Sequence, residues 1–458
     1  MALVKTLNKI IREANFLSLA GNLLFAVFGF AGFAILARTF PLNVFGEWVL
    51  YISSATFIEM FRFGITNWAI IRYLSGVEKE QRLKYIGSNA LIILIATIGI
   101  AIVIWSFHLA FPGPIKRAGY ELFFTWYPFL ALINMPFNTA LVIMQADQRF
   151  GKILFVKTLN SGGFFFVLLA NYLFFKMTLT QLVWAQLGIN LVTSAICVIA
   201  GWDGMRHIRK ATRETNKVLL DFGKYTIFTL IGTNLLRSAD TLIISLSPMG
   251  TAAVALYSIP MKLTELQQIP LRSFVATAFP KMSKASMQGK IEEVKELFYT
   301  YSGVLSYLLL VISVITFVFA DFFVLVLGGR QYLGNDPITG VNTADIVRIF
   351  SVYGLLLPID RMTGAGLDSI NKPNRNFQKV MYMAITNIIG DLIAVFLFKS
   401  LALVAIASIL FTALGIWVGY YYYLDKQLML NYRKIFTSGI DFYVSMYQKF
   451  RKSKQLSR

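Results

Sequence analysis

Long apolar runs separated by short basic segments make up most of this chain. A helix that crosses a membrane needs about 20 mostly apolar residues. Twelve stretches meet this requirement, near residues 16–37, 45–71, 86–111, 120–145, 153–175, 179–201, 222–246, 252–279, 298–328, 344–366, 378–398 and 400–424. The sequence therefore predicts an all-α polytopic membrane protein with about 12 transmembrane helices.

The composition supports this class and excludes others. Of the 458 residues, 57% are hydrophobic and 14% are charged, whereas a soluble domain is typically ~45–50% apolar and ~25% charged. A soluble enzyme, a disordered chain and a disulfide scaffold are thereby excluded. The single cysteine, Cys197, and the distant His108 and His207 do not form a metal-ligand pattern. We expect no metal, no cofactor and no catalytic residues.

The positive charges predict the orientation. If the spans alternate, 30 of the 43 lysines and arginines lie on the side of the N-terminus and five on the other side. Such an excess is typical of cytoplasmic loops, so both termini are predicted to be cytoplasmic. The net charge of +20 follows from topology, and a nucleic-acid partner is not needed to explain it.

Weak internal similarity, at offsets of 208 and 209 residues, predicts two six-helix halves around a central cavity. The predicted organisation is an N-terminal half (1–202), a cytoplasmic connector (203–217), a C-terminal half (218–427) and a basic amphipathic cytoplasmic tail (428–458). A helix such as this tail is expected to lie on an anionic leaflet.

Charged residues within the spans mark the candidate site, because each costs at least ~2.5–3.5 kcal/mol at the bilayer centre. In three spans the polar residues share one helical face, covering arcs of about 120–140° where we counted them at 100° per residue. We expect these faces to line a common hydrated cavity. The charged members are Glu59, Arg62, Arg237, Asp240, Lys262, Glu265 and Arg272.

A purely structural interpretation stays open. Glu59 with Arg62, Arg237 with Asp240, and Lys262 with Glu265 are i,i+3 pairs that can neutralise one another. Asp391, in the middle of a later span, can either fix helix packing or bind an ion.

Motifs in both halves resemble a known family. They are Ala34–Arg38, Phe45–Trp48, Gly64, Arg72–Ser75, Asp240–Ile244 and Ala255–Ser258. The chain resembles Wzx-like polysaccharide flippases (O-antigen, capsule or exopolysaccharide), which share the MATE/MOP transporter superfamily with multidrug MATE exporters and the lipid II flippase. The resemblance covers nearly the whole chain and is more specific for the superfamily than for the substrate.

The resemblance implies alternating-access export of undecaprenyl-diphosphate-linked oligosaccharide across a bacterial plasma membrane, for polysaccharide biosynthesis. It further implies a cationic cavity that binds the diphosphate. Arg62, Arg237, Lys262 and Arg272 are the candidates for this role, and Glu59, Asp240, Glu265 and Asp391 are the candidates for binding a coupling H⁺ or Na⁺. The expected partners are the lipid-linked substrate, the bilayer and polysaccharide-assembly proteins.

Two alternatives remain at this point. The first is a MATE-like, cation-coupled exporter of small molecules, although four cations against three acids in the candidate cavity favour an anionic substrate. The second is a membrane glycan polymerase or ligase, which the short outer loops disfavour. No G-x-x-x-x-G-K-[ST] motif for ATP is present.

Overall fold

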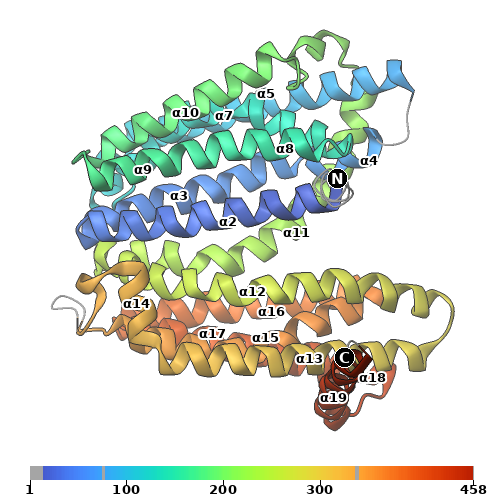
Figure 1. Cartoon of the computed structure of the whole chain (residues 1–458). Coiled ribbons are helices and arrows are strands. Elements are labelled where there is room, and N and C mark those ends of the chain that lie inside the picture. Colours follow the sequence, from blue (N-terminus) through green and yellow to red (C-terminus); the bar gives the residue numbers. More distant parts are fainter. Residues whose placement is uncertain (1–13, 75–77, 336–339, 457–458) are drawn as a thin grey trace. The chain divides into compact units, whose positions relative to one another are not determined.

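The computed structural model describes residues 14–74, 78–335 and 340–456 (Figure 1). Within these ranges it does not describe the side chains of residues 14–23, 68, 72, 224–237 and 449–456. Apart from one isolated bridge between Asn335 and Asn342, the regular structure in the described ranges is helical. The prediction of an all-α fold is confirmed.

The chain forms two compact units, and the first comprises residues 1–234 and 250–255. Its described elements are α2 (Ala14–Thr39), α3 (Leu42–Gly64), α4 (Asn67–Leu74), α5 (Lys79–Ala110), α6 (Pro112–Arg117), α7 (Glu121–Ala146), α8 (Phe150–Lys157), η1 (Thr158–Gly162), α9 (Gly163–Leu173), α10 (Leu179–Ile199), η2 (Met205–Lys210) and most of α11 (Arg213–Ser245). Helix α7 packs against both α5 and α10.

The second unit comprises residues 235–249 and 256–458. It contains the end of α11, most of α12 (Gly250–Met287), and then α13 (Ile291–Val318), α14 (Ala320–Gly328), η3 (Arg330–Tyr332), α15 (Thr343–Ser369), α16 (Pro373–Leu392), η4 (Ile393–Leu397), α17 (Leu401–Ile416), η5 (Trp417–Leu424), α18 (Asp425–Leu428) and α19 (Tyr432–Leu456). Helix α15 packs against α13 and α17, and α17 also packs against α16.

Each of the twelve predicted spans coincides with a long helix or with consecutive helical segments. Seven helices in the described ranges are long and apolar enough to cross a membrane by themselves: Lys79–Ala110, Glu121–Ala146, Phe150–Leu173, Leu179–Ile199, Ile291–Val318, Pro373–Leu397 and Leu401–Leu428. Helices α3, α11, α12 and α15 are equally long but carry more polar residues, including those of the predicted stripes. Helix α2 counts as a shorter apolar helix, because only Leu24–Thr39 of it is described with its side chains.

Two predicted spans are interrupted in the structure. The span predicted at 45–71 divides into α3 and α4, which are joined by Ile65 and Thr66. The span predicted at 298–328 divides at Phe319, where α13 ends and α14 begins. Asp321 in the first turn of α14 favours a new helix start there, because an acid stabilises the positive end of the helix dipole.

Large apolar side chains cover the outside of the long helices. On α5 these include Ile95, Ile102 and Leu109, which are between 60% and 70% exposed. In water such a surface would be unfavourable, whereas in a bilayer it faces acyl chains. The exposed apolar surface therefore supports the assignment of these helices to a membrane.

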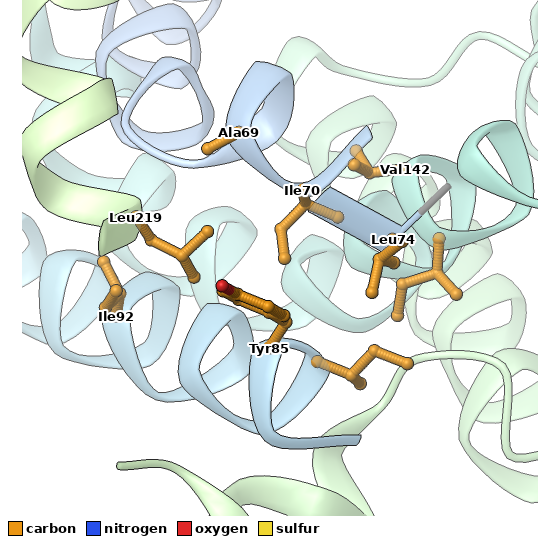
Figure 2. Packing of buried hydrophobic residues seen from close by; sticks show 9 residues of the cluster. Ala69, Ile70, Leu74, Tyr85, Ile92, Val142 and Leu219 are labelled. Atoms are coloured by element: carbon orange, nitrogen blue, oxygen red, sulfur yellow. The ribbon is translucent and has the colours of Figure 1, made fainter. Parts of the chain in front are cut away.

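A cluster of buried apolar residues joins four helices of the first unit (Figure 2). It consists of Ala69, Ile70, Leu74, Tyr85, Ile86, Ile92, Val142, Ile143 and Leu219. These residues come from α4, α5, α7 and α11. Burial of their apolar surface holds the ends of four helices together.

The predicted connector at 203–217 is packed against α5. A Cβ atom on Gly87 would lie 2.2 Å from the carbonyl oxygen of His207, so that only glycine allows this close approach. The hydroxyls of Ser88 and Thr215 are 2.6 Å apart beside it. This part of the chain is therefore fixed to the first unit.

The tail forms α19, which crosses α13 within the second unit. A Cβ atom on Gly303 would lie 2.0 Å from the carbonyl oxygen of Ile435 and 2.9 Å from the Cα of Gly439. The Tyr443 hydroxyl donates to the carbonyl oxygen of Val304 at 3.0 Å. One face of the predicted amphipathic helix is thus used for packing against α13.

Candidate functional site

The first polar cluster is centred on Arg62 in the first unit. Its side chain is completely buried. The guanidinium donates to Glu59 Oε2 at 2.7 Å, and it lies 4.3 Å from the centroid of the Phe63 ring. Glu59 and Arg62 therefore form the i,i+3 pair that the sequence allowed.

Two neighbouring helices supply the other acceptors of this guanidinium. It donates to Thr97 on α5 at 3.3 Å and to the carbonyl oxygen of Ala131 and the side chain of Asn134 on α7. Tyr127, also on α7, donates to Glu59 Oε1 at 3.0 Å. The cluster joins three helices, and Glu59, at 20% exposed, is the less buried member of the ion pair.

The second polar cluster is centred on Asn387 of α16 in the second unit. Its amide nitrogen donates to Asp240 Oδ1 and to Asp391 Oδ2, both at 2.9 Å. Tyr257 of α12 donates to Asp240 Oδ2 at 2.8 Å. Asp240 is 5% exposed, and Asn387 and Asp391 are completely buried.

This arrangement places two carboxylates within reach of one amide nitrogen. No lysine or arginine side chain that the structure describes lies within ion-pair distance of either. The other carboxylate oxygen of Asp391 and the amide oxygen of Asn387 are buried without a hydrogen-bond partner in the described part of the chain. Two buried carboxylates this close together are unfavourable unless positive charge balances them, and oxygen atoms are the preferred ligands of hard cations.

Lys262 and Glu265 form a third arrangement on α12. The Lys262 ammonium donates to Glu265 Oε2 at 2.8 Å, and the two side chains are 22% and 34% exposed. Ten residues after Lys262, Arg272 is exposed and donates to Gln268 Oε1 at 3.3 Å. These two cations of the predicted set are accessible from outside the protein.

The structure brings some of the predicted site residues into contact in pairs, but it does not bring all of them together. It brings Glu59 together with Arg62, Lys262 with Glu265, and Asp240 with Asp391. Arg237 is part of helix α11, but the structure does not describe its side chain. The remaining prediction, a shared cavity for all of them, stays a prediction.

Sequence reasoning missed the uncharged members of both clusters, namely Thr97, Tyr127, Asn134, Tyr257 and Asn387. Such residues are common in membrane helices, where they hydrogen-bond between helices. Asn387 carried one usable signal, since it lies four residues before Asp391 and thus on the same helical face.

Comparison with known proteins decides the family. The model of the family described as "Polysaccharide biosynthesis protein" matches residues 12–286, which is more than half of the chain. The chain belongs to this family. A search of curated proteins finds no match.

Solved structures show the fold of this member of the polysaccharide biosynthesis protein family. The lipid II flippase MurJ, in an inward closed conformation, is 12% identical with a TM-score of 0.68, and the alignment covers 95% of this chain and 93% of that protein. An inward-facing multidrug resistance MATE transporter of the MOP superfamily is 15% identical with a TM-score of 0.72, over 90% and 97% of the two chains.

A third structure is a MOP superfamily transporter from Pyrococcus furiosus, described as having a binding pocket of reverse polarity. It is 16% identical with a TM-score of 0.59, and the alignment covers 90% of this chain and 94% of that protein. The multi-pass membrane fold of this superfamily is thereby confirmed. The three solved structures that share this fold are a lipid II flippase and two transporters.

Proposed function

We propose that this protein is a flippase that exports undecaprenyl-diphosphate-linked oligosaccharide across the plasma membrane, with both termini in the cytoplasm. Membership of the polysaccharide biosynthesis family is the observation that carries the proposal. The fold similarity to a lipid II flippase over nearly the whole chain supports it. The fold similarity to MATE transporters keeps export of small cations as the alternative.

The diphosphate needs cationic groups that it can reach. Lys262 and Arg272 are accessible on α12, and guanidinium and ammonium groups bind phosphate oxygens with charge-assisted hydrogen bonds. Ten residues correspond to roughly 15 Å along a helix, so one diphosphate does not span both side chains. We infer that they act in succession, with Arg272, nearer the basic end of α12, as the first contact and Lys262 as the second.

This order makes distinct kinetic predictions. Arg272→Gln should raise the substrate concentration needed for half-maximal flipping, whereas Lys262→Gln should lower the maximal rate. Lys284→Gln, which removes a charge near the end of the same helix, serves as the control. Equal effects of Lys262→Gln and Arg272→Gln on the half-maximal concentration and on the maximal rate would contradict the order.

Arg237→Ala should abolish transport while insertion of the protein into the membrane stays intact.

We further propose that Asp240, Asn387 and Asp391 bind the coupling cation, H⁺ or Na⁺. Two buried carboxylates that share the amide nitrogen of Asn387 support this. Asp391→Asn should remove the dependence of transport on the cation gradient, and Asp345→Asn, an exposed acid on α15, should leave it unchanged. The same comparison applied to Glu59 and Glu265 tests the other two candidate acids.

The decisive experiment measures outward movement of an undecaprenyl-diphosphate oligosaccharide in proteoliposomes. A membrane potential that is negative on the cytoplasmic side favours outward movement of each negative charge by about 2.3 kcal/mol per 100 mV. Flipping stimulated by this potential would support anion export, and flipping stimulated only by a cation gradient would support coupling at Asp240 and Asp391. Absence of flipping over a panel of glycans, together with export of organic cations, would favour the MATE-like alternative.

A further inference from the structure

A small pocket in the first unit is built from residues that belong to neither polar cluster. Its volume is about 170 Å³. Arg82 and Ile86 contribute to it from the start of α5, Asp147 and Arg149 from the turn after α7, and Trp202 from the turn after α10. Neither the family nor the proposed transport mechanism assigns a role to this pocket.

The ends of two helices place its key side chains. The backbone at Gln148 and Gly201 is left-handed, with φ of 54° and 66°. In each case the next residue donates back into the helix, Arg149 to the Met144 carbonyl and Trp202 to the Cys197 carbonyl, both at 2.9 Å. This is the Schellman pattern that closes a helix C-terminus. The pocket residues Arg149 and Trp202 are thus held by the backbone geometry of both helix ends.

The walls of the pocket carry an excess of positive charge. Asp147, which is 10% exposed, pairs with the Arg82 guanidinium and, at 3.2 Å, with that of Arg149. Two guanidiniums therefore share one carboxylate, and Arg149 is 53% exposed. The Lys152 ammonium lies 4.7 Å from the centroid of the Trp202 ring. Of the two guanidiniums in the wall, that of Arg149 is the more exposed, and Lys152 adds a positive charge beside the pocket, on the ring of the lining residue Trp202.

The floor of the pocket is apolar and firmly packed. Ile86 and Ile143 line it and also belong to the buried cluster of Figure 2. Met144, which lines it as well, belongs to a second cluster with Cys197. A volume of about 170 Å³ equals the share of roughly five or six water molecules in the liquid and lies below the ~300–1,000 Å³ of sites for larger ligands. The pocket suits a phosphate headgroup and is too small for an oligosaccharide.

The surroundings of the pocket favour a lipid over a soluble anion. Val198 and Ile199, just before the turn, are 38% and 77% exposed and offer a surface for acyl chains. The half-buried indole of Trp202 is a side chain that membrane proteins concentrate at the headgroup level. Basic pockets between helix ends are known sites for anionic lipid headgroups.

We propose that this pocket binds the phosphate headgroup of an anionic phospholipid, with Arg149 as the cationic contact in its wall, Lys152 beside the pocket as a second cation, and Trp202 at the headgroup level. The bound lipid would connect the ends of α5, α7 and α10. Binding should therefore stabilise the folded protein whether or not it transports a glycan.

The test uses the full-length protein in a neutral detergent, with thermal unfolding as the readout. Phosphatidylglycerol should raise the Tm in a saturable manner, while phosphatidylcholine should not. Arg149→Gln should weaken the apparent affinity about tenfold, as expected for the loss of one charge-assisted contact, and Arg149→Gln combined with Lys152→Gln should weaken it further. Arg209→Gln, which removes an exposed charge on η2 outside the pocket, is the matched control.

Three results would overturn the proposal. The first is an absence of any Tm difference between the two lipids. The second is an equal loss in Arg209→Gln, which would indicate a diffuse basic surface. The third is an equal stabilisation by inorganic phosphate or glycerol 3-phosphate, since this would identify the ligand as a soluble anion.

Discussion

The ammonium group of Lys379 lies 2.7 Å from a carboxylate oxygen of Asp360, and both side chains are at least 95% buried. The same ammonium also donates to the backbone carbonyl of Asp360 at 3.1 Å. The pair joins α15 to α16 inside the second unit. Arg361, 4.0 Å from the second carboxylate oxygen, is half exposed and compensates this carboxylate only in part.

Lys379→Met should therefore destabilise the protein by about 3–5 kcal/mol, because it leaves a buried carboxylate without its main partner. Lys379→Met combined with Asp360→Leu should recover most of that loss, since an apolar pair needs no compensation. The measurement is unfolding by SDS titration from detergent micelles. A double variant that is less stable than Lys379→Met would contradict this explanation.

Gly439→Ala should weaken the attachment of α19 to α13. The added methyl group would lie within 3 Å of the backbone of Gly303, and overpacking of this kind typically costs 1–3 kcal/mol. Limited proteolysis should cleave the tail of this variant faster. Gly99→Ala is the control, because nothing lies within 4 Å of the added methyl group there, and alanine favours a helix over glycine.

Glu59→Gln should cost more stability than Arg62→Met. The first change leaves the completely buried Arg62 guanidinium with only uncharged hydrogen-bond acceptors, at a cost of about 3 kcal/mol. The second leaves Glu59, which is 20% exposed and keeps the hydrogen bond from Tyr127, at a cost of about 1–2 kcal/mol. The reverse order in unfolding titrations would show that Arg62 stabilises the fold in some way other than this pairing.

Asn387→Leu should remove the hydrogen bonds to both Asp240 and Asp391 and cost about 1–3 kcal/mol. If these acids bind the coupling cation, Na⁺ or acid pH should stabilise the wild-type protein, and the variant should lose that stabilisation. Asn160→Leu breaks a comparable interhelical bond to Asn190 and should lower stability without changing the response to the cation. A cation response that survives in Asn387→Leu would exclude Asn387 from the site.

Apolar length predicted the helical segments well, because the backbone of a span must make its hydrogen bonds within helices in the bilayer. The breaks at Ile65 and Phe319 were not predicted, since the hydropathy of the sequence continues across both. Backbone packing, such as that of Gly223 against the carbonyl oxygen of Ile65, depends on contacts between distant parts of the chain. The pattern of a single segment does not contain this information.

The candidate site was predictable where charges are spaced within one helix. The pairs Glu59 with Arg62 and Lys262 with Glu265 follow from i,i+3 geometry. The bridging of Asp240 and Asp391 by Asn387 joins residues about 150 positions apart, and an uncharged amide gives no signal in hydropathy. Arg62 is buried and Arg272 is exposed. This difference likewise depends on the neighbouring helices.

The close packing of the segment between α10 and α11 against α5 has a practical consequence for labelling the protein. Because the Gly87 backbone touches that of His207, extra residues inserted near His207 would displace the segment from α5 and misfold its surroundings. The turn at Gly289, by contrast, has open space around it and a φ of 71°. A fluorescent reporter or an affinity epitope placed at Gly289 should be tolerated, and that turn is where an engineered handle for imaging or purification belongs.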